Sequence, residues 1–248
     1  MNEYAVIVGG GAIGQALTNK LLSGSDENVL LISDEPIYID ASFSERFQFV
    51  NCRVDHQTNW LLLMRDCQRI SSVTFTIPAC ASRDEKKSAT VVGHTSAFIE
   101  NIGSINLALL NLIEEVAPKL TSNSQIVGVS SVLGRRIALA DASLDYHASK
   151  SVLEAIFRYL SVRLAPHTTC NLVAPGLMTR DESSALLTDA ELRQKVSQST
   201  PLERPGTTDE VAQACFLLAT GCLPYLTGQI LTLDGGGSLM EPFSLAKR

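Results

Sequence analysis

Short runs rich in β-branched residues alternate with longer helix-like stretches along this chain, and this alternation restricts the folds that it can adopt. The strand-like runs are Tyr4–Val8, Val29–Ser33, Phe47–Val54, Val73–Ile77, Gln125–Ser130, Thr168–Val173 and Gln229–Leu233. The helix-like stretches are Ala12–Leu22, Thr58–Ile70, Thr95–Pro118, Leu144–Leu164 and Thr208–Ala219. Because most runs are too apolar to have a wet face, helices must cover both sides of a parallel sheet. We therefore predict one doubly wound α/β domain over residues 1–248, with about seven parallel strands.

Composition and charge exclude several classes of protein. The chain has 248 residues, 45% of them hydrophobic, which is not the composition of a disordered chain. A net charge of −6 argues against a nucleic-acid or anionic-membrane binder, and no apolar run reaches the length of a membrane span. The N-terminus has no signal-peptide pattern, and six scattered cysteines predict buried, reduced thiols, so we expect a cytoplasmic protein. The four histidines have no metal-ligand spacing, so no metal site is expected.

A glycine loop separates the first strand-like run from the helix that follows. Gly9, Gly11 and Gly14 form a G-x-G-x-x-G pattern. Gly9 permits a tight turn, Gly11 lets a pyrophosphate approach the backbone, and Gly14 lets the helix pack closely on the sheet. Ala12 and Ile13 open the helix, whose free N–H groups attract phosphate. Residues 9–14 are therefore predicted to bind a dinucleotide, as in a Rossmann-type domain.

Acidic residues after the next two strand-like runs bear on which dinucleotide binds. Asp34 follows Gly14 by twenty residues, and its carboxylate is placed to accept hydrogen bonds from the adenosine ribose. Asp34 and Glu35 would repel a 2′-phosphate, and no Arg or Lys stands beside either segment, so NAD is favoured over NADP. For Asp55 two interpretations remain open: a hydrogen bond to the adenine amine, or an N-cap of the helix ahead of Thr58.

A second group of polar residues lies in the segment 125–165. The run Gln125–Ser130 ends in Ser130-Ser131, and Tyr146 and Lys150 are four residues apart on one face of the following helix. An ammonium near a phenol stabilises the phenolate, which then exchanges a proton with an alcohol or carbonyl near neutral pH. A serine hydroxyl at the adjacent strand end can hold the same oxygen.

The pair is not explained by core packing of its helix. The apolar stripe is expected at Ala148, Val152, Ala155, Ile156 and Tyr159, on roughly the opposite side from Tyr146 and Lys150. For His147 a surface position is expected.

Taken together, these motifs make the whole chain resemble the short-chain dehydrogenase/reductase family. Its Y-x-A-S-K motif is similar to residues 146–150, its N-x-x-x-P-G-x-x-x-T segment to residues 171–176 with Thr179 after them, and its last strand to residues 225–236. The resemblance implies that Tyr146 is the acid/base, that Lys150 assists it and holds the nicotinamide ribose, and that Ser131 binds the substrate oxygen. It further implies that Asn101 positions a relay water and that Pro175, Gly176 and Thr179 line the nicotinamide. Residues 177–203 would cover the active site.

Three departures place the chain in a divergent branch of that family. The glycine loop is one residue shorter than usual, and Thr76-Ile77-Pro78-Ala79 stands where the family has N-N-A-G. The loop between Ser131 and Tyr146 is about two residues longer than usual.

The resemblance implies an oxidoreductase that transfers hydride between a nicotinamide cofactor and an alcohol/carbonyl pair. Two alternatives stay open: a dinucleotide-binding sensor or scaffold without turnover, and a lyase or epimerase on the same fold. We expect a fairly apolar hydroxy or keto substrate. Residues 177–203 are interpreted either as a closing lid or as ordinary surface helices. Apolar residues beyond one stripe on the helices 95–118 and 144–164 predict a homodimer or homotetramer.

Overall fold

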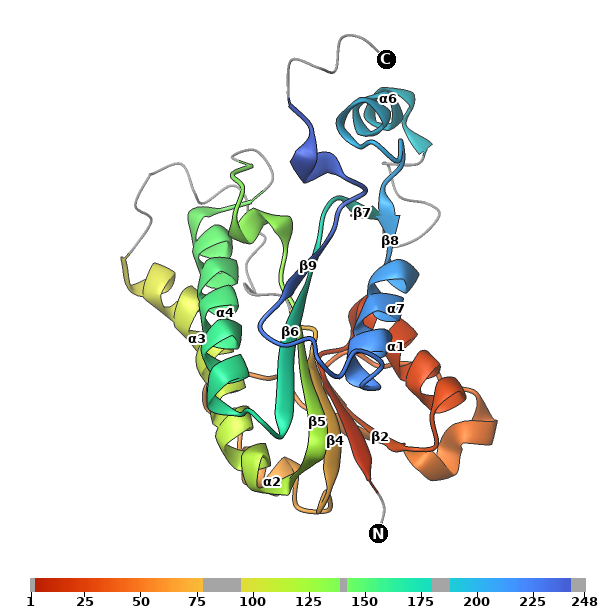
Figure 1. Cartoon of the computed structure of the whole chain (residues 1–248), viewed down its shortest axis with the longest axis vertical. Helices are drawn as coiled ribbons and strands as arrows, with labels where there is room; N and C mark the ends of the chain where they lie inside the picture. The colour runs from red at the N-terminus through yellow and green to blue at the C-terminus, as the bar shows by residue number, and fades with distance from the viewer. Residues whose placement is uncertain (1–2, 78–94, 139–141, 180–187, 242–248) are drawn as a thin grey trace.

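The computed structural model describes residues 3–77, 95–138, 142–179 and 188–241 (Figure 1). Its central sheet has seven parallel strands in the order β3-β2-β1-β4-β5-β6-β9. Their bounds are β1 (Tyr4–Val8), β2 (Asn28–Ser33), β3 (Phe47–Asn51), β4 (Ile70–Phe75), β5 (Leu120–Val129), β6 (Thr168–Pro175) and β9 (Ile230–Leu233). The strand order reverses between β1 and β4, where doubly wound folds bind their ligands. The predicted fold class is confirmed.

Helices cover both faces of this sheet (Figure 1). One face carries α1 (Gly11–Gly24) and α7 (Thr208–Ala219), and the other carries α2 (Trp60–Leu63), α3 (Thr95–Val116) and α4 (Leu144–Arg163). The short strands β7 (Met178–Thr179) and β8 (Gly206–Thr207) pair in parallel, and α6 (Ala190–Ser199) lies between them in sequence. Turns of 3-10 helix occur at η1 (Ala41–Arg46), η3 (Ala117–Lys119), η4 (Val132–Gly134) and η5 (Gly237–Leu239).

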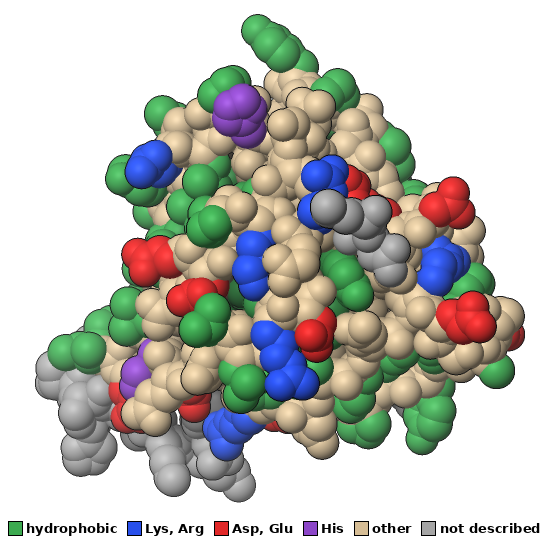
Figure 2. Space-filling view, turned by 90° about the horizontal axis from the view of Figure 1, so that it is seen from below, with side chains coloured by type: hydrophobic (Ala, Val, Ile, Leu, Met, Phe, Trp, Pro, Cys, Tyr) green, Lys and Arg blue, Asp and Glu red, His purple; other side chains and the backbone are tan. Residues whose placement is uncertain are grey.

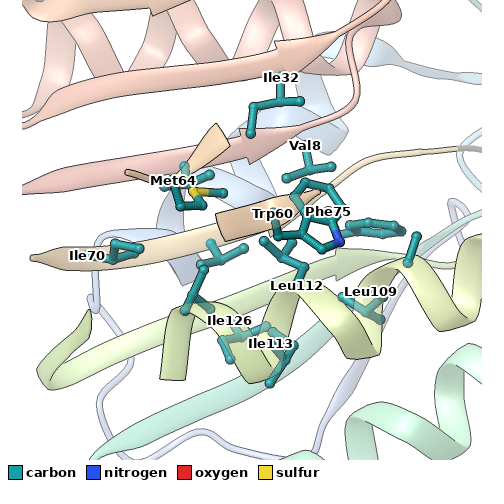
Figure 3. Close-up of a cluster of buried hydrophobic side chains, with 14 of the residues drawn as sticks. Val8, Ile32, Trp60, Met64, Ile70, Phe75, Leu109, Leu112, Ile113 and Ile126 are labelled. Carbon is teal, nitrogen blue, oxygen red and sulfur yellow. The ribbon is translucent and has the colours of Figure 1, made fainter. Parts of the chain in front are cut away.

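Each face of the sheet has its own hydrophobic cluster. Along β1, Val6 and Val8 point into the cluster under α2, α3 and α4, whereas Ala5 and Ile7 point into the cluster under α1 and α7. The first cluster contains Trp60, Phe75, Leu109, Leu112 and Ile126, which pack between the strands and the helices (Figure 3). Because both faces are buried, the strands read as near-continuous apolar runs in the sequence.

The segment 58–70 forms less helix than its pattern predicts. Only α2 is helical there, and its N-cap is Asn59, whose side chain accepts from Leu62 N. Ile70 belongs instead to β4, where it pairs with Tyr4 and Leu120. Trp60, Met64, Cys67 and Ile70 are all buried, and they are three or four residues apart, as on one face of a helix. The pattern alone therefore does not reveal that a strand begins at Ile70. The strand β5 begins at Leu120, five residues before its predicted start, and β3 ends at Asn51.

The helix α4 presents the opposite face to the core from the one predicted. Val152 is 37% exposed and Tyr159 is 67% exposed, although both belong to the expected apolar stripe. The buried residues are His147, Ser149, Lys150, Leu153, Glu154, Phe157, Leu160 and Ser161. The surface position expected for His147 is therefore wrong. Polar groups on the inner face are stabilised by specific partners, which a hydrophobicity pattern does not register.

Within the described ranges, no helix combines the length and apolarity that crossing a bilayer requires. On the face seen from below, acidic, basic and apolar side chains are interspersed (Figure 2). Cys67, Cys170 and Cys215 are buried as expected, but Cys222 is exposed.

Candidate active site

The glycine loop connects β1 to α1, and its backbone conformation requires glycine. Gly9 has φ +107° and Gly11 has φ +64°, both in the region that favours glycine. A Cβ at Gly14 would overlap with the carbonyl oxygen of Gly9, so the first turn of α1 needs glycine there to pack against the loop. A Cβ at Gly11 would meet only the Glu35 carboxylate, at 3.4 Å. The loop therefore has the glycine conformations and the close packing on α1 that are expected of a dinucleotide-binding loop.

The start of α1 adds a positive electrostatic end to this loop. The helix begins at Gly11, one residue before its predicted start, and its first turn contains exposed Ala12 and half-buried Ile13. Backbone N–H groups in a first turn have no partner within their helix, and they are aligned with the helix dipole. These residues thus fit the dinucleotide that the sequence predicts.

Thr76, just after β4, forms hydrogen bonds to the glycine loop. The sequence analysis did not identify this role. Its hydroxyl donates to Gly9 O at 2.7 Å, and its N–H donates to Val8 O at 2.9 Å. Thr76 is the first residue of the segment that replaces the N-N-A-G motif. A polar residue after a strand is ordinary in a sequence, so this position does not stand out there. Pro78 and Ala79 lie outside the described residues.

The acidic residues lie at the carboxyl ends of β2 and β3, two neighbouring strands. Asp34 is exposed directly after β2, and the N–H of Glu35 donates to Ser33 Oγ at 2.9 Å. Asp55 Oδ1 accepts from Gln57 N at 2.8 Å. Because Asn59 caps α2, the N-cap interpretation of Asp55 is wrong, and its contact with adenine stays a prediction.

Ser131, Tyr146 and Lys150 come together from the end of β5 and the first turns of α4. Ser131 is 8% exposed, and its hydroxyl accepts from Leu133 N at 3.2 Å as the N-cap of η4. Tyr146 is half-buried. Lys150 is buried, its Nζ donates to Val129 O at 2.9 Å, and it lies 5.8 Å from the centroid of the Tyr146 ring. Burial lowers the pKa of Lys150 to about 8.

Asn101 joins this group through the residue before the tyrosine. It is half-buried on α3, and its Nδ2 donates to Asp145 Oδ2 at 2.6 Å. This hydrogen bond ties α3 to the first turn of α4. The water-positioning role of Asn101 stays a prediction, since its side chain is engaged by a carboxylate in this structure.

The segment after β6 brings three further predicted residues to the same edge of the sheet. Pro175 is the last residue of β6, and Gly176 N donates to Leu233 O at 3.0 Å. A Cβ at Gly176 would lie 2.6 Å from Asp234 Cβ, so this glycine permits a close crossing of two chain segments. Thr179 is buried in β7, and its hydroxyl donates to Gly206 O at 3.3 Å. Of the predicted lid, residues 180–187 lie outside the described ranges, and α6 is the helix found in the rest.

Comparison with known proteins identifies the family. Residues 40–238 match the family model described as enoyl-(acyl carrier protein) reductase. A relative from Arabidopsis thaliana, named short-chain dehydrogenase/reductase SDRA, is 26% identical over 73% of this chain and 69% of its own length. The chain belongs to the short-chain dehydrogenase/reductase family. Carbonyl reductase family member 4 from Danio rerio is 30% identical over 97% of this chain and all of its own length.

Solved structures agree on the fold of this short-chain dehydrogenase/reductase. The structure titled ElxO with NADP bound has a TM-score of 0.76 at 20% identity, over 97% of this chain and all of that one. A short-chain dehydrogenase from Leptospira borgpetersenii with bound NAD+ has a TM-score of 0.74 at 20% identity, over 96% and 94% of the two chains. Family membership makes the protein a hydride-transferring oxidoreductase that acts on small molecules.

Proposed function

We propose that this protein interconverts an alcohol and a carbonyl compound, with Tyr146 as acid/base and NAD(H) as the preferred cofactor. The observation that carries the proposal is the buried Lys150, whose Nζ lies 5.8 Å from the Tyr146 ring centroid beside the strand end that holds Ser131. Burying an ammonium is unfavourable, and its position beside a phenol at the carboxyl edge of a parallel sheet suits proton transfer.

Each residue has a defined part in the reducing direction. A reduced nicotinamide bound there would supply the hydride that the carbonyl carbon needs. Ser131 donates a hydrogen bond to the carbonyl oxygen, and Tyr146 gives that oxygen its proton, so one hydride and one proton make the alcohol. The Lys150 ammonium stabilises the phenolate that remains, and Asn101 carries the water through which Tyr146 regains a proton. In the oxidising direction, Tyr146 accepts the proton of the alcohol.

The preference for NAD over NADP rests on charge near the glycine loop. Asp34 is exposed at the end of β2, and the Glu35 carboxylate is the nearest group to a Cβ placed at Gly11. Two carboxylates there accept hydrogen bonds from ribose hydroxyls and repel a 2′-phosphate. The adenine contact of Asp55 and the nicotinamide contacts of Pro175, Gly176 and Thr179 belong to the same proposal. The substrate class is a fairly apolar hydroxy or keto compound, covered by residues 177–203.

An exposed apolar surface on α3 and α4 supports self-association. These helices pack together on one side of the sheet (Figure 1). Their exposed apolar side chains are Ile99, Leu107, Leu144, Val152, Tyr159 and Val162. Such a surface favours burial against a second copy, giving a homodimer or, by pairing of dimers, a homotetramer. Sizing with light scattering that gives a monomer at micromolar concentration would refute this.

A cofactor titration followed by turnover tests the proposal. Reduced-nicotinamide fluorescence gives the Kd for NADH and for NADPH, and Asp34→Ala with Glu35→Gln serves as the charge control. We expect wild type to bind NADH more tightly than NADPH. In the Asp34→Ala, Glu35→Gln variant the ratio of the two Kd values should move towards one. A panel of ketones then tests turnover with wild type and with Tyr146→Phe. Full activity of Tyr146→Phe would overturn its role, and NADH binding without any turnover would favour a sensor.

A further inference from the structure

Glu154 places a buried carboxylate directly behind the strand end that carries Ser131. It lies one turn after Lys150 on α4, and it is 4% exposed. Its Oε1 accepts from Ser130 Oγ at 3.3 Å and forms an ion pair with Arg135 Nε at 3.3 Å. One carboxylate oxygen therefore contacts Ser130, which precedes Ser131, and Arg135, which follows the turn η4.

Two more side chains of α4 hold the same turn. His147 Nδ1 donates to Leu133 O at 2.7 Å, since a carbonyl can only accept. Ser151 Oγ donates to Gly134 O at 2.6 Å. With Glu154, these residues follow the helical spacing i, i+4, i+7 and form one stripe, which lies next to the stripe of Tyr146 and Lys150. We call His147, Ser151 and Glu154 the clamp.

The approach of the turn to the helix is too close for a side chain at position 134. A Cβ at Gly134 would lie 2.9 Å from Glu154 Oε1 and 3.3 Å from the backbone carbon of Lys150. Arg135 also contacts the edge strand β9, where its Nη2 donates to Thr232 Oγ1 at 3.2 Å. The segment 130–135 is thus fixed on several sides, and Ser131 is inside it.

We propose that Glu154 is a positioning residue, which with His147 and Ser151 sets the place of Ser131 relative to Tyr146. This rests on the proposed roles of Ser131 and Tyr146. An isolated buried carboxylate is unfavourable, and here it is stabilised by Ser130 and Arg135. These two residues flank Ser131 and the turn η4, which we call the catalytic turn. A displacement of about 1 Å in a group that orients substrate can lower the rate by about 100-fold, so a clamp of this kind affects kcat more than cofactor affinity.

The test compares Glu154→Gln and Arg135→Met with Glu3→Gln. Glu3 is the matched control, because it also pairs with an arginine, Arg69 Nη2 at 2.5 Å, but is more exposed and lies at the start of β1, away from the active site. Hydrogen exchange followed by mass spectrometry reports on residues 131–136, where Gly134, Arg135 and Arg136 N–H groups bond within the turn. NADH affinity comes from fluorescence, and kcat and KM from the ketone that wild type reduces best among cyclohexanone, acetophenone and ethyl acetoacetate.

We expect faster exchange in residues 131–136 and a loss of kcat of about tenfold in Glu154→Gln and Arg135→Met, with NADH affinity within about twofold of wild type. Glu3→Gln should change none of these. Unchanged exchange, or faster exchange with unchanged kcat, overturns the positioning role. If Glu154→Gln does not fold, Arg135→Met decides, since Arg135 is on the surface. If wild type reduces no ketone, the proposed function fails separately, and the exchange result alone decides whether the clamp exists.

Discussion

Replacing Lys150 by methionine should remove turnover and change how the stability of the protein depends on pH. Lys150 is buried, and burial lowers its pKa from 10.5 to about 8. That difference corresponds to about 3 kcal/mol, at about 1.4 kcal/mol for each pH unit. Below pH 8 the side chain is charged in both folded and unfolded states, so the folded state carries the whole burial penalty.

The direction of the pH effect follows from which state binds the proton. Between pH 8 and 10.5 the unfolded chain keeps the Lys150 proton and the folded chain loses it, so folding stability rises with pH in this window. Buried cysteines oppose this rise. Burial raises the pKa of Cys67 to about 11, and those of Cys170 and Cys215 to about 12. Their thiols ionise first in the unfolded chain, which lowers folding stability above pH 9.

The difference between wild type and Lys150→Met isolates the lysine, because both proteins contain the same cysteines. Urea unfolding at several pH values and one fixed protein concentration measures it. At pH 7 the variant gains up to about 3 kcal/mol from removal of the charge and loses about 1–3 kcal/mol with the hydrogen bond to Val129 O. From pH 8 to 10 wild type should gain about 2 kcal/mol relative to the variant. Parallel pH dependences of the two proteins would refute the burial argument.

Three further substitutions test other parts of the structure. Gly14→Ala should raise the Kd for NADH at least about tenfold in fluorescence titration. The added Cβ would overlap with Gly9 O, and such overpacking costs about 1–3 kcal/mol. An unchanged Kd would contradict the loop geometry. Thr76→Val should lower stability to urea by about 1–3 kcal/mol and weaken NADH binding, because Gly9 O loses its donor. Thr74→Val is the matched control, since among the described residues its buried hydroxyl has no partner, and equal effects of the two would be contrary to the proposed brace. Tyr159→Asp should shift the protein towards monomer in light scattering, because it puts a charge on an exposed apolar surface.

The fold could be predicted from sequence because its main signals are local. Apolar strands buried on both faces, with helices between them, leave few arrangements, and the seven strands of the central sheet overlap the seven predicted runs. The short strands β7 and β8 were not predicted. The errors fall where two patterns coincide. The residues Trp60, Met64 and Cys67 continue to Ile70 at helical spacing, yet Ile70 pairs in the sheet. Strand pairing is a long-range interaction that a local window does not contain.

The sequence predicted those residues of the candidate site whose chemistry requires a particular residue type at a particular spacing. Glycines with positive φ, a Tyr and a Lys on one helix face, and serines at a strand end each stand out from the sequence. Thr76 and Glu154 do not, because a threonine after a strand and a glutamate within a helix are ordinary. Their roles depend on which backbone atoms the fold brings near them: Gly9 O for Thr76, and the catalytic turn for Glu154.

The helix α4, whose buried face is opposite to the predicted one, connects the active site with the proposed self-association. Its inner face carries His147, Lys150 and Glu154, which bind the catalytic turn and the end of β5, so polar groups occupy positions that apolar residues usually fill. Its apolar residues Val152 and Tyr159 are consequently on the outside. Leu153, Phe157 and Leu160 of this helix pack into the core of one chain, and a second copy on the outer face would add burial of Val152 and Tyr159. Self-association would then stabilise the helix that holds Tyr146 and Lys150, and thereby the catalytic geometry.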